Sequence, residues 1–155
     1  MGLFGTKKTS KGTIEEVIDM IDRYYKRRGL DIAGHQLDGC EGYGWWLMEG
    51  AAKVYVFVQE DKEGPVIRVN SPILHIPPAN CEAFYRKLLE INRDLSGCCL
   101  SLFDEVVMVT GQRPTRGLDQ EELNDLVWNV SYVADTLEDQ LSKQFDARVF
   151  IESGV

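Results

Sequence analysis

The stretch most informative about the fold is residues 118–145, with the sequence LDQEELNDLVWNVSYVADTLEDQLSKQF. Asp119 is placed to cap a helix, and Glu122 is placed to reach back to the free backbone N–H of the cap residue. Leu118 precedes the cap and is positioned to pack against Leu123 as a hydrophobic staple. The stretch therefore predicts a long helix that begins at Asp119.

An apolar stripe runs along this predicted helix at helical spacing. Its members are Leu123, Val127, Val130, Ala134, Leu137, Leu141 and Phe145. A helix that continues through Asp146 is about 42 Å long at about 1.5 Å per residue, which exceeds the roughly 30 Å of a small domain. We therefore expect the last turns, around Leu141 and Phe145, to overhang or bend and to contact a neighbour.

The rest of the chain divides into helix-like and strand-like stretches. Thr13 and Glu16 form a capping-box pattern at the start of an amphipathic helix. Pro77 and Pro78 separate a group of strand-like runs from a second helix, which Asn80 is placed to cap. The predicted elements are helix 14–28, strands 45–49, 54–59 and 66–76, helix 80–95, strands 98–103 and 106–111, and the final helix.

The predicted order of elements is α-β-β-β-α-β-β-α. Consecutive strands with segregated helices favour an α+β fold, with an antiparallel sheet and helices on one face. At 155 residues the chain has the length of one domain. We expect a single α+β domain at residues 13–150, a flexible N-terminal tail at 1–12 and a C-terminal tail at 151–155. Pro72 interrupts the third strand, which predicts an edge position, a bulge or a strand end there.

The predicted strands are apolar on both faces. Val54, Val56 and Val58 point one way and Tyr55 and Phe57 point the other. The helices cover one face, so the second face needs other cover. An uncovered apolar face usually marks an interaction site, and self-association is the simplest way to cover it. The alternative is that the long helix and the tail wrap round to cover it.

Trp45 and Trp46 are adjacent on a predicted strand, so their indoles face opposite ways. One is expected in the core and the other on the second face, near Tyr55 or Phe57. A core role for both is the alternative, since aromatic side chains dominate cores as well as interfaces. Our candidate partner-contact residues are Trp45, Trp46, Tyr55, Phe57, Leu141 and Phe145.

The composition is acidic, with 25 acidic against 17 basic residues and a net charge of −8. This balance disfavours nucleic acid and anionic membranes as partners. Because no apolar run has the length of a secretory signal or a membrane span, we expect reduced cysteines and a cytoplasmic location. The stretch 1–6 fits a loose myristoylation pattern, for which a frayed tail is the alternative.

Residues with catalytic chemistry are few. His35 lies near Cys40, but their spacing matches no closed zinc pattern, and the chain has no GxSxG, HExxH, P-loop or GxGxxG motif. Cys98 and Cys99 are expected to be buried thiols. We therefore predict a non-enzymatic protein with no catalytic residue, cofactor or metal. The alternative is a small-molecule sensor or a thiol-dependent enzyme that uses Cys40 with His35.

Several stretches between Thr13 and Phe145 resemble a known family. They are a helix with a Leu-Leu-x-x-Asn pattern at 84–92, a strand hairpin after it, and the helix start at 118–123. Together they resemble the YbjN family of bacterial sensory transduction regulators, with a fold similar to the type III secretion chaperones. The resemblance implies a homodimer. It also implies a chaperone-like or regulatory module that binds a protein or peptide, because secretion chaperones of this fold bind extended client segments across the sheet and helices.

Overall fold

The computed structural model describes residues 9–152, which form three α-helices, a short 3-10 helix and five strands. Their order is that predicted, α-β-β-β-α-β-β-α. The elements are α1 (Ile14–Arg27), η1 (Ile32–His35), β1 (Tyr43–Glu49), β2 (Ala52–Asp61), β3 (Gly64–His75), α2 (Cys81–Asp94), β4 (Cys99–Phe103), β5 (Val106–Pro114) and α3 (Gln120–Phe145).

The five strands form one antiparallel sheet in the order β1-β2-β3-β5-β4, so the predicted fold class is confirmed. Pro72 lies in the central strand β3, where the register with β5 shifts between Pro72 and Leu74. The proline therefore marks a bulge, one of the outcomes that its sequence position predicted. Asp104 and Glu105 join β4 to β5 as expected, and Asp104 takes a left-handed backbone conformation in this turn (φ 51°).

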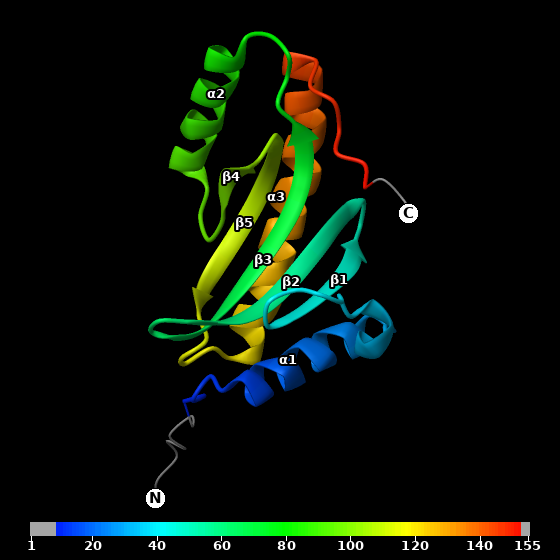
Figure 1. Ribbon diagram of the computed structural model, residues 1–155, viewed down its shortest axis with the longest axis vertical. Coiled ribbons are helices and arrows are strands. Elements are labelled where there is room, and N and C mark those ends of the chain that lie inside the picture. Colours follow the sequence, from blue (N-terminus) through cyan, green and yellow to red (C-terminus); the bar gives the residue numbers. More distant parts are fainter. Residues whose placement is uncertain (1–8, 153–155) are drawn as a thin grey trace, which may run out of the picture.

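One face of the sheet packs against α3. Figure 1 shows α3 running behind β2, β3 and β5, with which it makes its main sheet contacts. On this face every second strand residue is buried, as the strand period requires. The buried strand residues include Val54, Val56, Val58, Ile67, Val69, Val107 and Val109. The core of the protein therefore lies between this aliphatic face and the predicted stripe of α3.

The other two helices lie at opposite ends of the sheet, with α1 below it and α2 beside β4 in Figure 1. Tyr25 of α1 donates its hydroxyl proton to the carbonyl oxygen of Trp46 at 2.9 Å. The side-chain amide of Asn92 in α2 accepts from the N–H of Leu100 at 2.7 Å and donates to the Leu100 carbonyl at 3.1 Å. The Asn of the Leu-Leu-x-x-Asn pattern therefore fastens α2 to β4.

The last turns of α3 do not overhang the domain. Leu141 is fully buried, and the ring of Phe145 meets the buried ring of Phe84 in α2 edge-on at 5.2 Å between centroids. The prediction of an overhang is wrong because Leu141 lies in the core and Phe145 packs against Phe84 of α2.

The helix N-termini follow the sequence signals in part. At α3 the Asp119 carboxylate accepts from the Glu122 N–H, and the Glu122 carboxylate accepts from the Asp119 N–H, which confirms the capping box. At α1 the Thr13 hydroxyl accepts from the Glu16 N–H, but the Glu16 carboxylate accepts from the Ser10 hydroxyl. Only half of the predicted box is present, because Glu16 binds the segment that precedes the helix.

Two further expectations concern turn and terminal residues. Asn80 precedes α2 in a left-handed conformation (φ 59°) and its side chain makes no capping bond, so the predicted cap is wrong. The segment before α1 is held by the loop after β5, since the Thr115 hydroxyl donates to the Gly12 carbonyl at 2.6 Å. The myristoylation pattern at 1–6 lies outside the described residues. Within residues 9–152, no helix is long and apolar enough to cross a membrane.

Candidate functional site

The face of the sheet opposite α3 carries a mixed apolar and polar surface, which we call the open face. One row of paired residues crosses it from Trp46 through Tyr55, Asn70 and Thr110 to Cys99. All five are at least partly exposed. The neighbouring row runs from Phe57 through Arg68 to Gln112. This confirms that the helices leave the second face uncovered among the described residues, as the strand pattern predicted.

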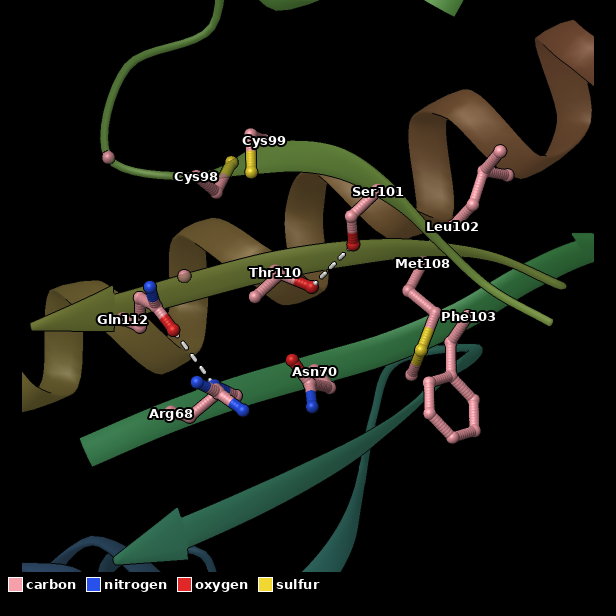
Figure 2. A pocket seen from close by; sticks show the side chains of 12 residues that line it. Arg68, Asn70, Cys98, Cys99, Ser101, Leu102, Phe103, Met108, Thr110 and Gln112 are labelled. Atoms are coloured by element: carbon pink, nitrogen blue, oxygen red, sulfur yellow. Dashed lines mark hydrogen bonds between the residues drawn. The ribbon is translucent and has the colours of Figure 1, made fainter. Parts of the chain in front are cut away.

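Two adjoining hollows of about 650 and 550 Å³ lie on this face, and we call them together the open-face groove. They share Arg68, Asn70, Phe103 and Met108. The larger one extends over Tyr55 and Phe57 on β2, and the smaller one reaches β4. Figure 2 shows the smaller hollow, with side chains of β3, β4 and β5 on the near side of the sheet and α3 behind it. The groove thus spans four strands, from β2 to β4.

The floor of the groove includes polar groups between the apolar ones. The hydroxyls of Ser101 and Thr110 are hydrogen-bonded at 3.0 Å, and Arg68 donates to the Gln112 amide oxygen at 2.8 Å (Figure 2). The side-chain oxygen of Asn70 is buried and lacks a hydrogen-bond partner among the described residues. Asn70 as a whole is half-buried and lines both hollows, so the middle of the groove is polar.

A charged cluster lies at one end of the groove. The carboxylate of Glu152 accepts from the Tyr55 hydroxyl at 3.0 Å and forms a salt bridge with Lys53. The Lys53 ammonium also lies 4.9 Å from the ring centroid of Trp46. The hydrogen bond from Lys53, followed by that from Tyr55, lowers the pKa of Glu152. Burial, followed by the hydrogen bond to Glu152, raises the pKa of Tyr55. This end of the groove thus binds a carboxylate.

The structure divides the six predicted contact residues. Trp46, Tyr55 and Phe57 have partly exposed side chains on the open face. Trp45 and Leu141 are buried in the core, with 3% and 0% exposure. They are buried because Trp45 shares a face with the β2 valines and Leu141 belongs to the core stripe of α3. Phe145 is half-buried against α2.

His35 and Cys40 are engaged with different groups. The Nδ1 atom of His35 lies 2.9 Å from the Asp31 carbonyl oxygen, and its ring packs on Trp46 at 4.6 Å between centroids. The Cys40 thiol lies 3.8 Å from the Leu37 carbonyl oxygen. No hydrogen bond joins His35 to Cys40 in the described part of the chain. Within residues 9–152, no three His, Cys, Asp or Glu side chains are grouped to hold a metal ion.

Sequence reasoning missed several groove residues. Met108, Arg68 and Asn70 are not among the predicted contact residues. Their only sequence signal is their position on alternate strand sites, which does not say that they meet across strands. Cys99 was expected to be buried and is exposed, and Cys98 is half-buried. Cys99 is exposed because its strand, β4, lies at the edge of the sheet.

The fold and the groove define a class of protein, the small α+β modules of type III secretion chaperone-like fold. The chain belongs to the TY-Chap1 family, described as T3SS (YopN, CesT) and YbjN peptide-binding chaperone 1, whose profile matches residues 34–153, more than half of the chain. The predicted resemblance is thereby confirmed. No curated protein sequence matches the chain.

Two solved structures share the fold. The crystal structure of the ExsC–ExsE complex matches with a TM-score of 0.63 and 15% identity, covering 82% of this chain and 94% of the matched chain. The crystal structure of YbjN from E. coli matches with a TM-score of 0.51 and 10% identity, covering 93% of this chain and all of that one. At these identities the likeness concerns the fold alone.

Proposed function

We propose that this protein is a non-enzymatic, chaperone-like or regulatory module that acts in the cytoplasm and binds an extended segment of a partner protein in its open-face groove. The observation that carries this proposal is the groove itself, which joins apolar side chains such as Phe57 and Met108 to the polar side chains of Asn70 and Arg68. Membership of a peptide-binding chaperone family supports it. So does the likeness to a structure of a complex, ExsC–ExsE.

An extended peptide fits the groove for two physical reasons. Its side chains alternate, so every second one is able to enter the hollows beside Phe57 and Met108. Its backbone also brings N–H and C=O groups to a floor that carries the polar side chains of Asn70, Arg68 and Gln112. Recognition of peptides by strand-like binding uses this combination of apolar pockets and main-chain hydrogen bonds.

A selection of 12-residue peptides from a displayed library tests this function. We expect selected peptides to bind the intact chain, and to lose at least about tenfold in affinity, or about 1.4 kcal/mol, when Phe57→Asp or Met108→Asp places a charge in the groove. Tyr132→Asp is the matched control, because Tyr132 is an exposed aromatic residue (57%) on α3, remote from the open face. Equal losses at the control position, or no loss in the groove variants, would refute the proposal.

We further propose that the protein is a homodimer whose interface includes α2 and the edge strand β4. Tyr85 and Leu89 lie one turn apart on α2, and Leu89 is 71% exposed. Leu102 of β4 is 47% exposed and also lines the smaller hollow, so this interface borders the open-face groove. Exposed apolar groups on adjoining elements favour self-association. Sedimentation velocity of wild type and Leu89→Asp tests this proposal: we expect a dimer and a monomer, respectively, and a monomeric wild type at all concentrations would refute it.

A further inference from the structure

The segment that follows α3 lies against the sheet as an added strand. The His75 N–H donates to the Arg148 carbonyl at 2.8 Å, and the Phe150 N–H donates to the Ile73 carbonyl at 2.9 Å. Val149 forms an antiparallel bridge with Leu74. The segment thus pairs with the end of β3, and Figure 1 shows it descending from the end of α3 along this side of the sheet.

The side chains of this segment alternate between the two faces, as in any strand. Ala147 is buried in the core and Val149 packs against it. Phe150 instead lines the larger hollow of the open-face groove, with its ring 5.6 Å from that of His75. Glu152 is bound by Lys53 and Tyr55 on the same face. The chain therefore places an aromatic side chain in one end of its own groove and, two residues later, a carboxylate beside that end, on Tyr55.

We propose that residues 147–152 act as an internal ligand of the groove, and that the partner is an extended peptide that reproduces their pattern, an aromatic residue followed two positions later by a carboxylate. This inference rests on the proposed peptide-binding function. The partner peptide displaces Phe150 and Glu152 when it binds, so the C-terminal segment lowers the affinity of the groove for every peptide that must displace it.

The charges of the groove support an acidic peptide. The protein has a net charge of −8, yet Lys53 and Arg68 project on the open face. Arg68 is hydrogen-bonded to the neutral amide of Gln112 and forms no salt bridge among the described residues. A second carboxylate on the peptide therefore finds a guanidinium available in the middle of the groove.

The contacts of the segment are of a kind that a competitor is able to replace. The Lys53–Glu152 salt bridge is exposed, with 30% and 51% of the two side chains accessible, and exposed ion pairs contribute little. Phe150 lines the larger hollow without filling it, so the space beside Phe57 and Met108 is open to a peptide while Phe150 is in place. A tethered segment of this kind competes at an effective concentration on the order of 1 mM.

A binding experiment with two full-length proteins tests the inference. The probe is a fluorescein-labelled peptide with the sequence of residues 146–152, and the proteins are the wild type and the double variant Phe150→Ala/Glu152→Gln. We expect the probe to bind the double variant at least about tenfold more tightly, since the tethered competitor at about 1 mM is weakened there. A probe that itself carries Phe150→Ala should bind neither protein. The single variant Glu152→Gln changes only an exposed ion pair and should bind the probe more tightly than wild type, but by less than the double variant does. Because this change is mild, it controls for a loss of folding in the double variant.

The outcomes separate this inference from the proposed function. If library-selected peptides bind wild type and double variant equally and the probe binds neither, the internal ligand is refuted while peptide binding stands. If neither the probe nor any library peptide binds either protein, the proposed function fails as well. Selected peptides that bind the double variant at least about tenfold more tightly than wild type, and that carry an aromatic residue two positions before an acid, support the inference.

Discussion

Replacing Gly111 by alanine tests how closely α3 packs on the sheet. Gly111 lies in β5 beneath α3, and a Cβ atom there would come within 2.7 Å of Leu126 Cδ1, 3.0 Å of Val130 Cγ2 and 3.1 Å of the Gly97 carbonyl oxygen. The Leu126 tip is able to rotate away. Val130 is β-branched and rotationally stiff in a helix, so α3 must move outward by a few tenths of an ångström or β5 must yield.

The size of the effect follows from these contacts. Overpacking a tight core costs about 1–3 kcal/mol, and the lower chain entropy of the unfolded alanine variant returns about 0.4–1 kcal/mol. We therefore expect Gly111→Ala to lower the free energy of unfolding by about 1–2 kcal/mol. At about 2–4 °C per kcal/mol for a domain of this size, the midpoint of thermal unfolding falls by about 2–8 °C.

Urea and thermal unfolding followed by circular dichroism measure this change. Gly34→Ala is the matched control, because nothing lies within 4 Å of the Cβ position at Gly34 and its φ is not positive. The control should leave stability unchanged or raise it by up to about 1 kcal/mol. Combining Gly111→Ala with Leu126→Ala should recover about 0.5 kcal/mol or more of the packing penalty, since the two sites touch. If Gly111→Ala is as stable as Gly34→Ala, the close packing of α3 on β5 is refuted.

Three further measurements follow from the helices. Burial raises the pKa of Tyr24 and Tyr25. The stability that the two buried, protonated phenols contribute to the fold is therefore complete below the ordinary tyrosine pKa of about 10, and it is lost as the pH rises toward the folded-state pKa. Absorbance at 295 nm should show both phenols ionising only when the protein unfolds at alkaline pH. Asn92→Ala leaves the backbone of Leu100 without its side-chain partners and should cost about 1–3 kcal/mol in urea unfolding, with no comparable loss for a surface change elsewhere on α2. Asp119→Ala removes the α3 cap and should cost about 1 kcal/mol in the same assay; a neutral result contradicts the capping geometry.

Most of the fold could be predicted because its signals are local. The α3 helix has its capping box and its apolar stripe within one stretch, and the tight turn at Asp104 leaves only one way to pair β4 with β5. The packing of the last turn of α3 against α2 could not be predicted from a local signal. It depends on Phe84, some sixty residues earlier in the chain, and no local pattern shows that Phe84 meets Phe145.

The groove could be predicted only as an apolar face. Tyr55 and Phe57 are conspicuous as aromatic residues in a valine-rich strand, whereas Asn70 is an ordinary polar residue until the register sets it beside Tyr55 and Thr110. The position of Glu152 could not be predicted from the sequence either, since the residues after the last helix show no pattern of a helix or strand. Its contact with Tyr55 joins residues 97 positions apart and needs the whole fold to form.

The two faces of the sheet differ in composition, and this difference indicates what kind of occupant the open face accepts. The face toward α3 is built of aliphatic side chains, of which Val56 and Val109 are examples, and a helix covers such a face permanently. The open face mixes Phe57 with Asn70 and Arg68. Burying these polar groups under a purely apolar surface would leave their remaining hydrogen-bonding atoms without partners, which costs free energy. The open face therefore disfavours a third apolar layer and favours an occupant with its own hydrogen-bonding groups, which an extended peptide backbone supplies along its whole length.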